Sequence, residues 1–168
     1  KNVEPVLTLE ALSADFDFAN MGRAAARFDP DDLKPLNAAI LARTPFSDVR
    51  ARLIAIDPRT DDGAFWLAVR ANCTTLDEAR VWADMVYGSP APLVDEVDRA
   101  FLSEALGLLP AGALTGDTWG AWTKAAGAAT GRKGKALFMT LRRALTGREN
   151  GPEMGPLLPL IGRAAIEA

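Results

Sequence analysis

The stretch Gly131-Arg-Lys-Gly-Lys-Ala-Leu-Phe-Met-Thr-Leu-Arg-Arg-Ala-Leu-Thr-Gly147 carries a helical pattern with two opposite faces. At about 100° per residue, one side collects the apolar residues Leu137, Leu141, Ala144 and Leu145. The opposite side collects Arg132, Lys135, Met139, Arg142, Arg143 and Thr146. A glycine directly after such a pattern is a typical helix stop. The stretch therefore predicts a loop over 127–134 and then a helix to Thr146, with one packing face and one cationic stripe.

Helical signals continue outward from this stretch over nearly the whole chain. Expected helix starts lie at Asp29, at Asp61 or Asp62, and at Thr74 or Thr75, where Glu78 has the spacing of a capping box. Further apolar periodicity predicts helices over 30–42, 46–54 and 93–110, and another that carries Trp119 and Trp122. Turn formers gather at 87–92. We therefore expect an all-α fold of two small helical subdomains, over residues 1–88 and 89–168.

The composition favours binding over catalysis. The 168 residues include one cysteine, Cys73, and no histidine. This excludes an internal disulfide, His-dependent catalytic triads and nearly every zinc site. No apolar run reaches the roughly 20 residues that a membrane span needs. The chain has no initiator Met and stops in what looks like a helix start, so we expect it to be part of a longer protein.

The net charge of −3 hides an asymmetry along the chain. Residues 1–120 hold 11 Lys and Arg against 19 Asp and Glu, a balance of −8, whereas residues 121–168 hold 8 against 3, a balance of +5. A basic end on an acidic chain can indicate a nucleic-acid partner. It can also be a pair of solvated faces, which is the more common case.

The cationic stripe and the loop after it, residues 148–154, are typical of surfaces that bind single-stranded RNA. Guanidinium groups and apolar side chains stack on splayed bases, and backbone groups bond to the base edges. The alternative is a solvated amphipathic helix with a tight loop. We expect the four tryptophans to belong mainly to the core, Asp95, Glu96 and Asp98 to form a solvated face rather than a metal site, and Cys73 to be an inert buried thiol.

The stretch 131–147, with Gly151-Pro152 and Leu157-Leu-Pro-Leu-Ile-Gly162, resembles the C-terminal region of bacterial glutamyl-tRNA synthetase. Phe16-Asp-Phe18, Ala26-Arg-Phe-Asp29 and Leu36-Asn37 are similar to the part of this family just after its catalytic domain, and Leu67-Ala-Val-Arg70 fits more loosely. The resemblance covers essentially the whole chain. It implies the end of a stem-contact region and a first anticodon-binding subdomain over 1–88, and a second such subdomain over 89–168.

The resemblance also implies which residues contact the anticodon of tRNA. Arg142 and Lys124 match basic residues that do so in the family, and a Thr-Pro loop that recognises bases corresponds to Gly151, Pro152 and Met154. Glycine in place of the threonine leaves only backbone contact at 151. Arg70 is the nearest match to an arginine of the first subdomain, although its spacing to Thr75-Leu76 is two residues too long. With the stripe, the predicted tRNA-binding set is Lys124, Arg132, Lys135, Met139, Arg142, Arg143, Gly151, Pro152, Met154 and Arg70.

The function that the resemblance implies is tRNA anticodon recognition within an ATP-dependent glutamate–tRNA ligase of class I. The His-Ile-Gly-His-type and Lys-Met-Ser-Lys-Ser-type catalytic motifs of the family are absent from these residues. We therefore expect no catalytic residue, metal or cofactor in this chain, with ATP and Mg²⁺ used by the parent enzyme. The expected partner is the anticodon stem-loop of tRNA-Glu, or also of tRNA-Gln, in the cytoplasm, with no DNA and no membrane. The competing hypothesis is a helical protein–protein interaction module that binds no RNA.

Overall fold

The computed structural model describes residues 5–22, 29–88 and 90–168, and these residues form helices and no strand. The α-helices among them are α1 Leu9–Ala14, α2 Leu33–Leu41, α3 Phe46–Ile56, α4 Gly63–Val69, α5 Glu78–Tyr87, α6 Arg99–Gly107, α7 Thr118–Thr130, α8 Lys135–Thr146, α9 Met154–Ile161 and α10 Arg163–Ile166. Short 3₁₀ helices are Phe18–Asn20, Pro30–Asp32, Pro58–Thr60, Arg70–Asn72 and Glu96–Asp98. The predicted all-α class is confirmed.

Three predicted helix boundaries agree with the structure because local chemistry sets them. The Asp29 carboxylate accepts a hydrogen bond from the Asp31 amide, and the Asp62 carboxylate accepts one from the Ala64 amide. Both are N-caps, which satisfy amides that have no partner within the helix. At the end of α8, Gly147 has φ of +64°, the left-handed conformation that favours glycine.

Three other boundaries were predicted wrongly. Helix α6 spans only Arg99–Gly107 of the helix expected over 93–110. Helix α7 continues through Gly127 to Thr130, so the loop expected over 127–134 is only its second half. Helix α5 begins at Glu78 and not at Thr74 or Thr75. The Glu78 carboxylate still accepts a hydrogen bond from the Thr74 amide, 2.7 Å away. The capping contact therefore forms, but it closes a turn that precedes the helix instead of starting the helix itself.

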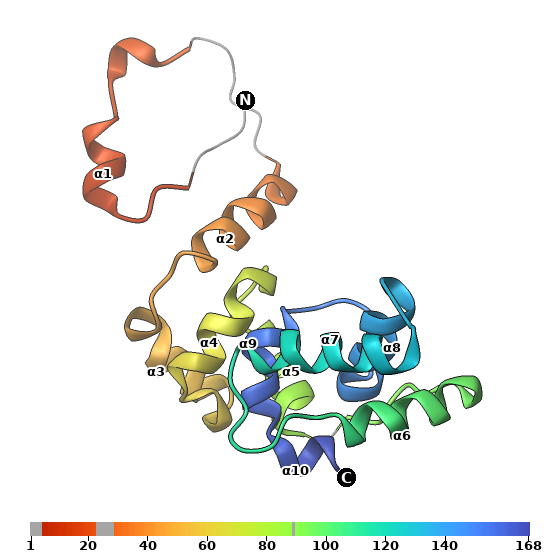
Figure 1. Cartoon of the computed structure of the whole chain (residues 1–168). Helices are drawn as coiled ribbons and strands as arrows, with labels where there is room; N and C mark the ends of the chain where they lie inside the picture. Colours follow the sequence, from red (N-terminus) through yellow and green to blue (C-terminus); the bar gives the residue numbers. More distant parts are fainter. Residues whose placement is uncertain (1–4, 23–28, 89) are drawn as a thin grey trace.

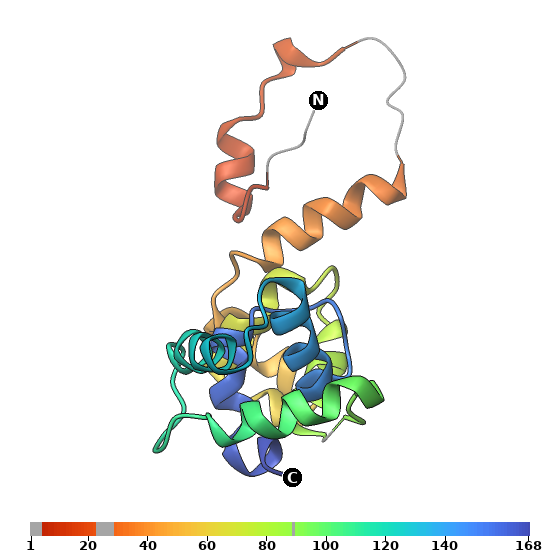
Figure 2. The ribbon, with the colours of Figure 1, turned by 45° about the vertical axis from the view of Figure 1, so that its right-hand side comes forward.

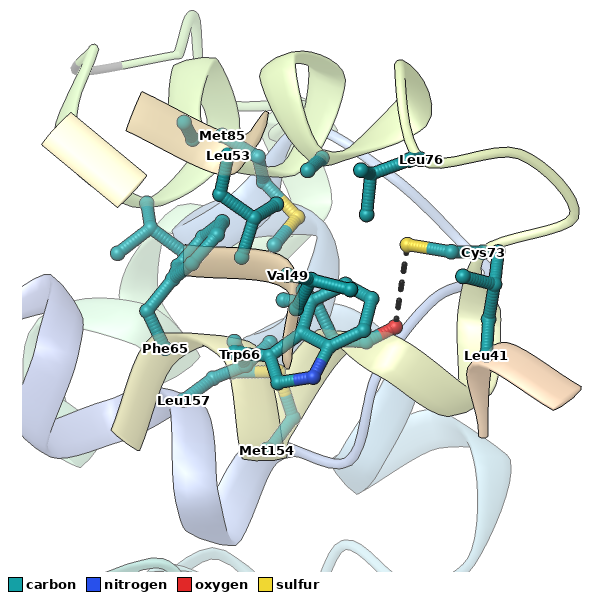
Figure 3. Packing of buried hydrophobic residues seen from close by; sticks show 14 residues of the cluster. Leu41, Val49, Leu53, Phe65, Trp66, Cys73, Leu76, Met85, Met154 and Leu157 are labelled. Atoms are coloured by element: carbon teal, nitrogen blue, oxygen red, sulfur yellow. Dashed lines mark hydrogen bonds between the residues drawn. The ribbon is translucent and has the colours of Figure 1, made fainter. Parts of the chain in front are cut away.

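Two hydrophobic cores are joined by helix α9. The first core is formed largely by α3, α4 and α5 and includes Met154 and Leu157 of α9 (Figure 3). The second is formed by α6, α7 and α8 and includes Leu158 of α9. Neighbouring residues of one short helix thus enter different cores, and α9 contacts α4, α5 and α7. In Figure 1 this helix lies centrally among them.

Helix α1 stands apart from this body in both ribbon views (Figures 1 and 2). None of its residues is buried. The segment Ala26–Phe28 of the family resemblance lies outside the described residues, as does Ser89 at the expected boundary. The division at residue 88 stays a prediction, because α9 packs against helices on both sides of it.

Candidate nucleic-acid interface

Arg142, near the end of α8, is half-buried and held by the following loop. Its Nη2 donates a hydrogen bond to the carbonyl oxygen of Pro152, 2.9 Å away. Its Nη1 is buried and has no hydrogen-bond partner among the described residues. Burial lowers the pKa of this guanidinium from its ordinary value. The alternative of a solvated helix face is wrong at Arg142, which is half-buried and pairs with neither Glu149 nor Glu153 among the described residues.

The loop over 148–154 is packed against the body and is not an open loop. Pro152 and Met154 are buried. Gly151 has φ of +147°, and a Cβ atom built there would lie 3.1 Å from Trp82 Cζ3. The Arg148 guanidinium lies over the Trp82 ring, with its carbon 5.5 Å from the ring centroid. The loop therefore packs against Trp82 of α5, and Arg142 is in turn held by its hydrogen bond to the loop.

An open hollow of about 410 Å³ lies beside Arg142, between α7, α8 and the start of α9. Its lining residues are Trp119, Phe138, Met139, Arg142, Glu153, Met154 and Gly155. Two aromatic rings, two thioethers, a guanidinium and a carboxylate offer apolar contact together with hydrogen-bond donors and acceptors. A nucleobase has the matching character, a flat ring with polar edges. The hollow unites three residues of the predicted set: Met139, Arg142 and Met154.

The cationic stripe is largely neutralised from the acidic part of the chain. Arg132 Nη1 lies 2.6 Å from Asp98 Oδ1, and Arg143 Nη1 lies 2.9 Å from Asp95 Oδ2. These carboxylates raise the pKa of Arg143, chiefly through the hydrogen bond with Asp95. The expected solvated face agrees with Asp95, which stays exposed beside Arg143, but not with Asp98, whose side chain is only 15% exposed. No group of His, Cys, Asp or Glu in the described ranges could hold a metal ion.

Thr146 was placed wrongly on the cationic face. It is buried, and its hydroxyl donates to the carbonyl oxygen of Arg142, 2.7 Å away. The Thr146 hydroxyl oxygen also accepts a hydrogen bond from the Arg148 amide, 3.2 Å away. Thr146 therefore fixes the turn after α8. Lys124 and Lys135 are exposed and form no ion pair within the described residues.

Arg70 lies elsewhere, at the end of α4. Its Nη1 donates to the carbonyl oxygen of Thr44, 3.1 Å away, and the Trp66 indole donates to the same oxygen at 2.9 Å. Arg70 thus ties the turn between α2 and α3 to α4, and it does not line the hollow beside Arg142. Its role in tRNA binding stays a prediction.

The tryptophans divide into two buried and two half-buried residues. Trp66 and Trp122 belong to the cores, as predicted, and the Trp122 indole donates to the carbonyl oxygen of Ala105 at 2.6 Å. Trp82 and Trp119 pack against the cores from their edges and also border the loop and the hollow. Sequence reasoning missed Trp119, Phe138 and Glu153. Phe138 had a signal in the sequence, because a phenylalanine four residues before Arg142 shares its side of the helix.

Cys73 is the buried, inert thiol that the sequence predicts. It lies in the first core, and its Sγ donates to the carbonyl oxygen of Val69 (Figure 3). Burial, with a smaller contribution from the negative charge of Glu78, raises the pKa of the thiol to about 12. The thiolate that reacts with electrophiles is therefore scarce at neutral pH.

A helical body with a base-sized aromatic hollow beside a half-buried arginine fits a class of RNA-binding domain. A family model described as an anticodon binding domain matches residues 31–168. The chain belongs to this anticodon-binding domain family.

Curated relatives point to one kind of protein. The chain is 58% identical over 165 residues to glutamate–tRNA ligase 2 of Hyphomonas neptunium and 51% identical over 166 residues to glutamate–tRNA ligase 1 of Rhizorhabdus wittichii. Each alignment covers 98% of this chain and 37% of the relative. The chain therefore spans a little over a third of the length of these relatives.

Solved structures share the fold. A glutamate tRNA ligase from Elizabethkingia meningosepticum superposes with a TM-score of 0.71 at 16% identity, covering 90% of this chain and 33% of that chain. The glutamate-tRNA synthetase of Elizabethkingia anophelis superposes at 0.72 and 15% identity, covering 99% and 38%. Within the described residues no helix is long and apolar enough to cross a membrane.

Proposed function

We propose that this chain is the tRNA-binding part of a glutamate–tRNA ligase and recognises the anticodon stem-loop of tRNA-Glu. The observation that carries the proposal is the hollow beside Arg142, a half-buried arginine of which Nη2 is bonded to the loop and Nη1 has no partner among the described residues. A buried donor without a partner costs free energy, so a hydrogen-bond acceptor that reaches it is bound favourably. The anticodon-binding family and the glutamate–tRNA ligases among the relatives support the same partner.

The chain acts in this proposal by recognition and not by chemistry. A splayed base enters the hollow, stacks on the aromatic rings and receives hydrogen bonds from Arg142, while the backbone of Gly151 and Pro152 supports the guanidinium. Lys124 and Lys135 attract the phosphates. Arg132 and Arg143 serve mainly to hold α8 against the acidic segment 95–98. ATP, Mg²⁺ and the transfer of glutamate belong to the rest of the longer enzyme, which works in the cytoplasm.

Fluorescence anisotropy with a labelled anticodon stem-loop of tRNA-Glu tests the proposal. Because lysines neutralise phosphates, the logarithm of the binding constant should fall as the logarithm of the salt concentration rises. Arg142→Ala should weaken binding by about 1–3 kcal/mol and relax discrimination at one base. Arg142→Lys keeps the charge but loses the planar fork of donors, so it should retain the salt dependence and lose the discrimination.

Arg52 of α3 provides a matched control, because it is exposed and forms no ion pair within the described residues. Arg52→Ala should leave binding unchanged. Thermal unfolding of each variant separates lost binding from lost folding. If the folded chain binds no stem-loop at low salt, the proposal fails and the protein–protein module remains. Parallel titrations with the stem-loops of tRNA-Glu and tRNA-Gln measure how far the chain separates the two.

A further inference from the structure

A second hollow of about 590 Å³ adjoins the one beside Arg142, at the junction of α7 and α8. Its lining includes Lys124, Lys133 and the edge of Leu137. Trp119 and Phe138 line both hollows, with their ring centroids 6.4 Å apart and their planes at 46°. These two rings therefore form the partition between two neighbouring spaces.

Phe138 is the exposed half of this partition. It remains 46% exposed, whereas its neighbour Leu137 is buried in the second core. Packing within the chain does not account for a phenylalanine that stays open on the sides of two hollows. Aromatic rings in this position offer a face to a nucleobase, and such stacking accepts any base.

The positive charge of the second hollow comes from two lysines. Lys124 and Lys133 are exposed and form no ion pair among the residues that the structure describes. The third cation of the hollow, Arg132, is held by Asp98, and its guanidinium lies 4.2 Å from the centroid of the Phe101 ring. Apolar surface with two available ammonium groups matches one nucleotide, which carries a flat base and one phosphate.

The position of the second hollow directly beside the Arg142 hollow indicates which ligand it would bind. A base in that hollow continues into the next nucleotide of the same strand, which must pass the rings of Trp119 and Phe138. We propose that Phe138 is a wedge that separates two consecutive nucleotides of the bound RNA loop. One base lies beside Arg142, and its neighbour lies against Phe138 with its phosphate at Lys124 and Lys133. This inference rests on the proposed function and adds a second nucleotide subsite to it.

Anticodon stem-loop RNAs with a single 2-aminopurine, moved through the loop positions in turn, test the wedge. Stacking on an aromatic ring changes the fluorescence of 2-aminopurine, so one loop position next to the Arg142-dependent base should respond on binding. Phe138→Ala should remove this response and weaken binding about tenfold. Phe138→Leu keeps apolar bulk, which protects the fold, and should also remove the response. Lys133→Gln should reduce the salt slope by about 0.7 in magnitude.

Two controls replace exposed residues that line neither hollow. Leu67→Ala removes another exposed apolar side chain, and Lys34→Gln removes a lysine that pairs with Asp31. If the unchanged chain binds RNA with Arg142-dependent base discrimination, but the Phe138 and Lys133 variants behave like these controls, the wedge is refuted and the proposed function stands. If the unchanged chain binds no RNA, both fall.

Discussion

Replacement of Gly151 by alanine tests whether the loop over 148–154 is packed on Trp82. The new Cβ would lie 3.1 Å from Trp82 Cζ3 and 3.3 Å from Cη2, closer than ordinary van der Waals contact. The backbone φ of +147° at this position is also a conformation that residues other than glycine rarely adopt. Gly151→Ala therefore meets two separate costs, one steric and one conformational.

The magnitude follows from these two contributions. A non-glycine residue in a sparsely populated backbone region costs about 1–3 kcal/mol. Forcing extra volume against a packed ring costs about 1–3 kcal/mol as well. We expect Gly151→Ala to lower the free energy of unfolding by about 3 kcal/mol, measured by urea denaturation at the helical circular-dichroism signal. Threonine, the residue at this position in the family that the sequence resembles, should cost more.

A double-mutant cycle separates the two contributions. Trp82→Leu removes the ring edge but leaves φ at 151 unchanged, so in that background Gly151→Ala should cost about 1–2 kcal/mol, the backbone contribution alone. Gly120→Ala, on α7 with open space around it, is the control and should be neutral or stabilising. The reasoning is refuted if Gly151→Ala lowers the free energy of unfolding equally with and without the Trp82→Leu change. It is also refuted if Gly151→Ala costs less than about 0.5 kcal/mol in the chain that keeps Trp82.

Three further measurements probe the cores. The Cys73 thiol, with its pKa near 12, should stay unreactive toward a disulfide reagent at pH 8 until the chain unfolds; rapid stoichiometric labelling of folded protein would contradict its burial. Burial and the charge of Asp62 raise the pKa of Tyr87 to about 12, above the ordinary 10, so the neutral phenol stabilises the fold fully below pH 10 and this stabilisation is lost as the pH rises through 12. Because the chain has one tyrosine, its absorbance at alkaline pH reports this titration directly. A titration midpoint near pH 10 in the folded state would contradict the raised pKa. Leu158→Ala should cost about 3 kcal/mol and keep a single unfolding transition, since α9 joins both cores; two separate transitions would show independent cores.

Local sequence predicted those helix ends that depend on one residue and its near neighbours. Asp29 and Asp62 cap their helices through carboxylates that bond to an amide two residues on. Gly147 ends α8 because glycine adopts the left-handed conformation readily. The extension of α7 past Gly127 was missed because Gly127 packs close to Leu137, which belongs to the next helix, α8. The periodicity of one helix does not show a contact between two helices.

The site was harder to predict, because a helical wheel shows only which residues share a face. It placed Arg143 correctly on α8, but Arg132 lies in the turn before that helix. It also could not show the partners of Arg132 and Arg143, which lie 34 and 48 residues earlier in the chain. It placed Thr146 with the cations, whereas the chain after Gly147 folds back and buries it. Met139, Arg142 and Met154 do meet in one hollow. The two aromatic residues that complete it come partly from α7, which the wheel of α8 cannot include.

The pairing of Arg132 and Arg143 has a consequence for how RNA would bind. The charge balance of +5 over residues 121–168 suggests strong attraction to phosphates, yet the acidic segment before α6 neutralises two of these cations. Three lysines, Lys124, Lys133 and Lys135, and one arginine, Arg148, remain exposed without ion pairs in the described ranges. Four neutralised phosphates give a salt slope of only about −3 on single-stranded RNA. Affinity would then depend chiefly on the bases held beside Arg142 and Phe138, so this surface is better suited to select one loop sequence than to hold any RNA by charge.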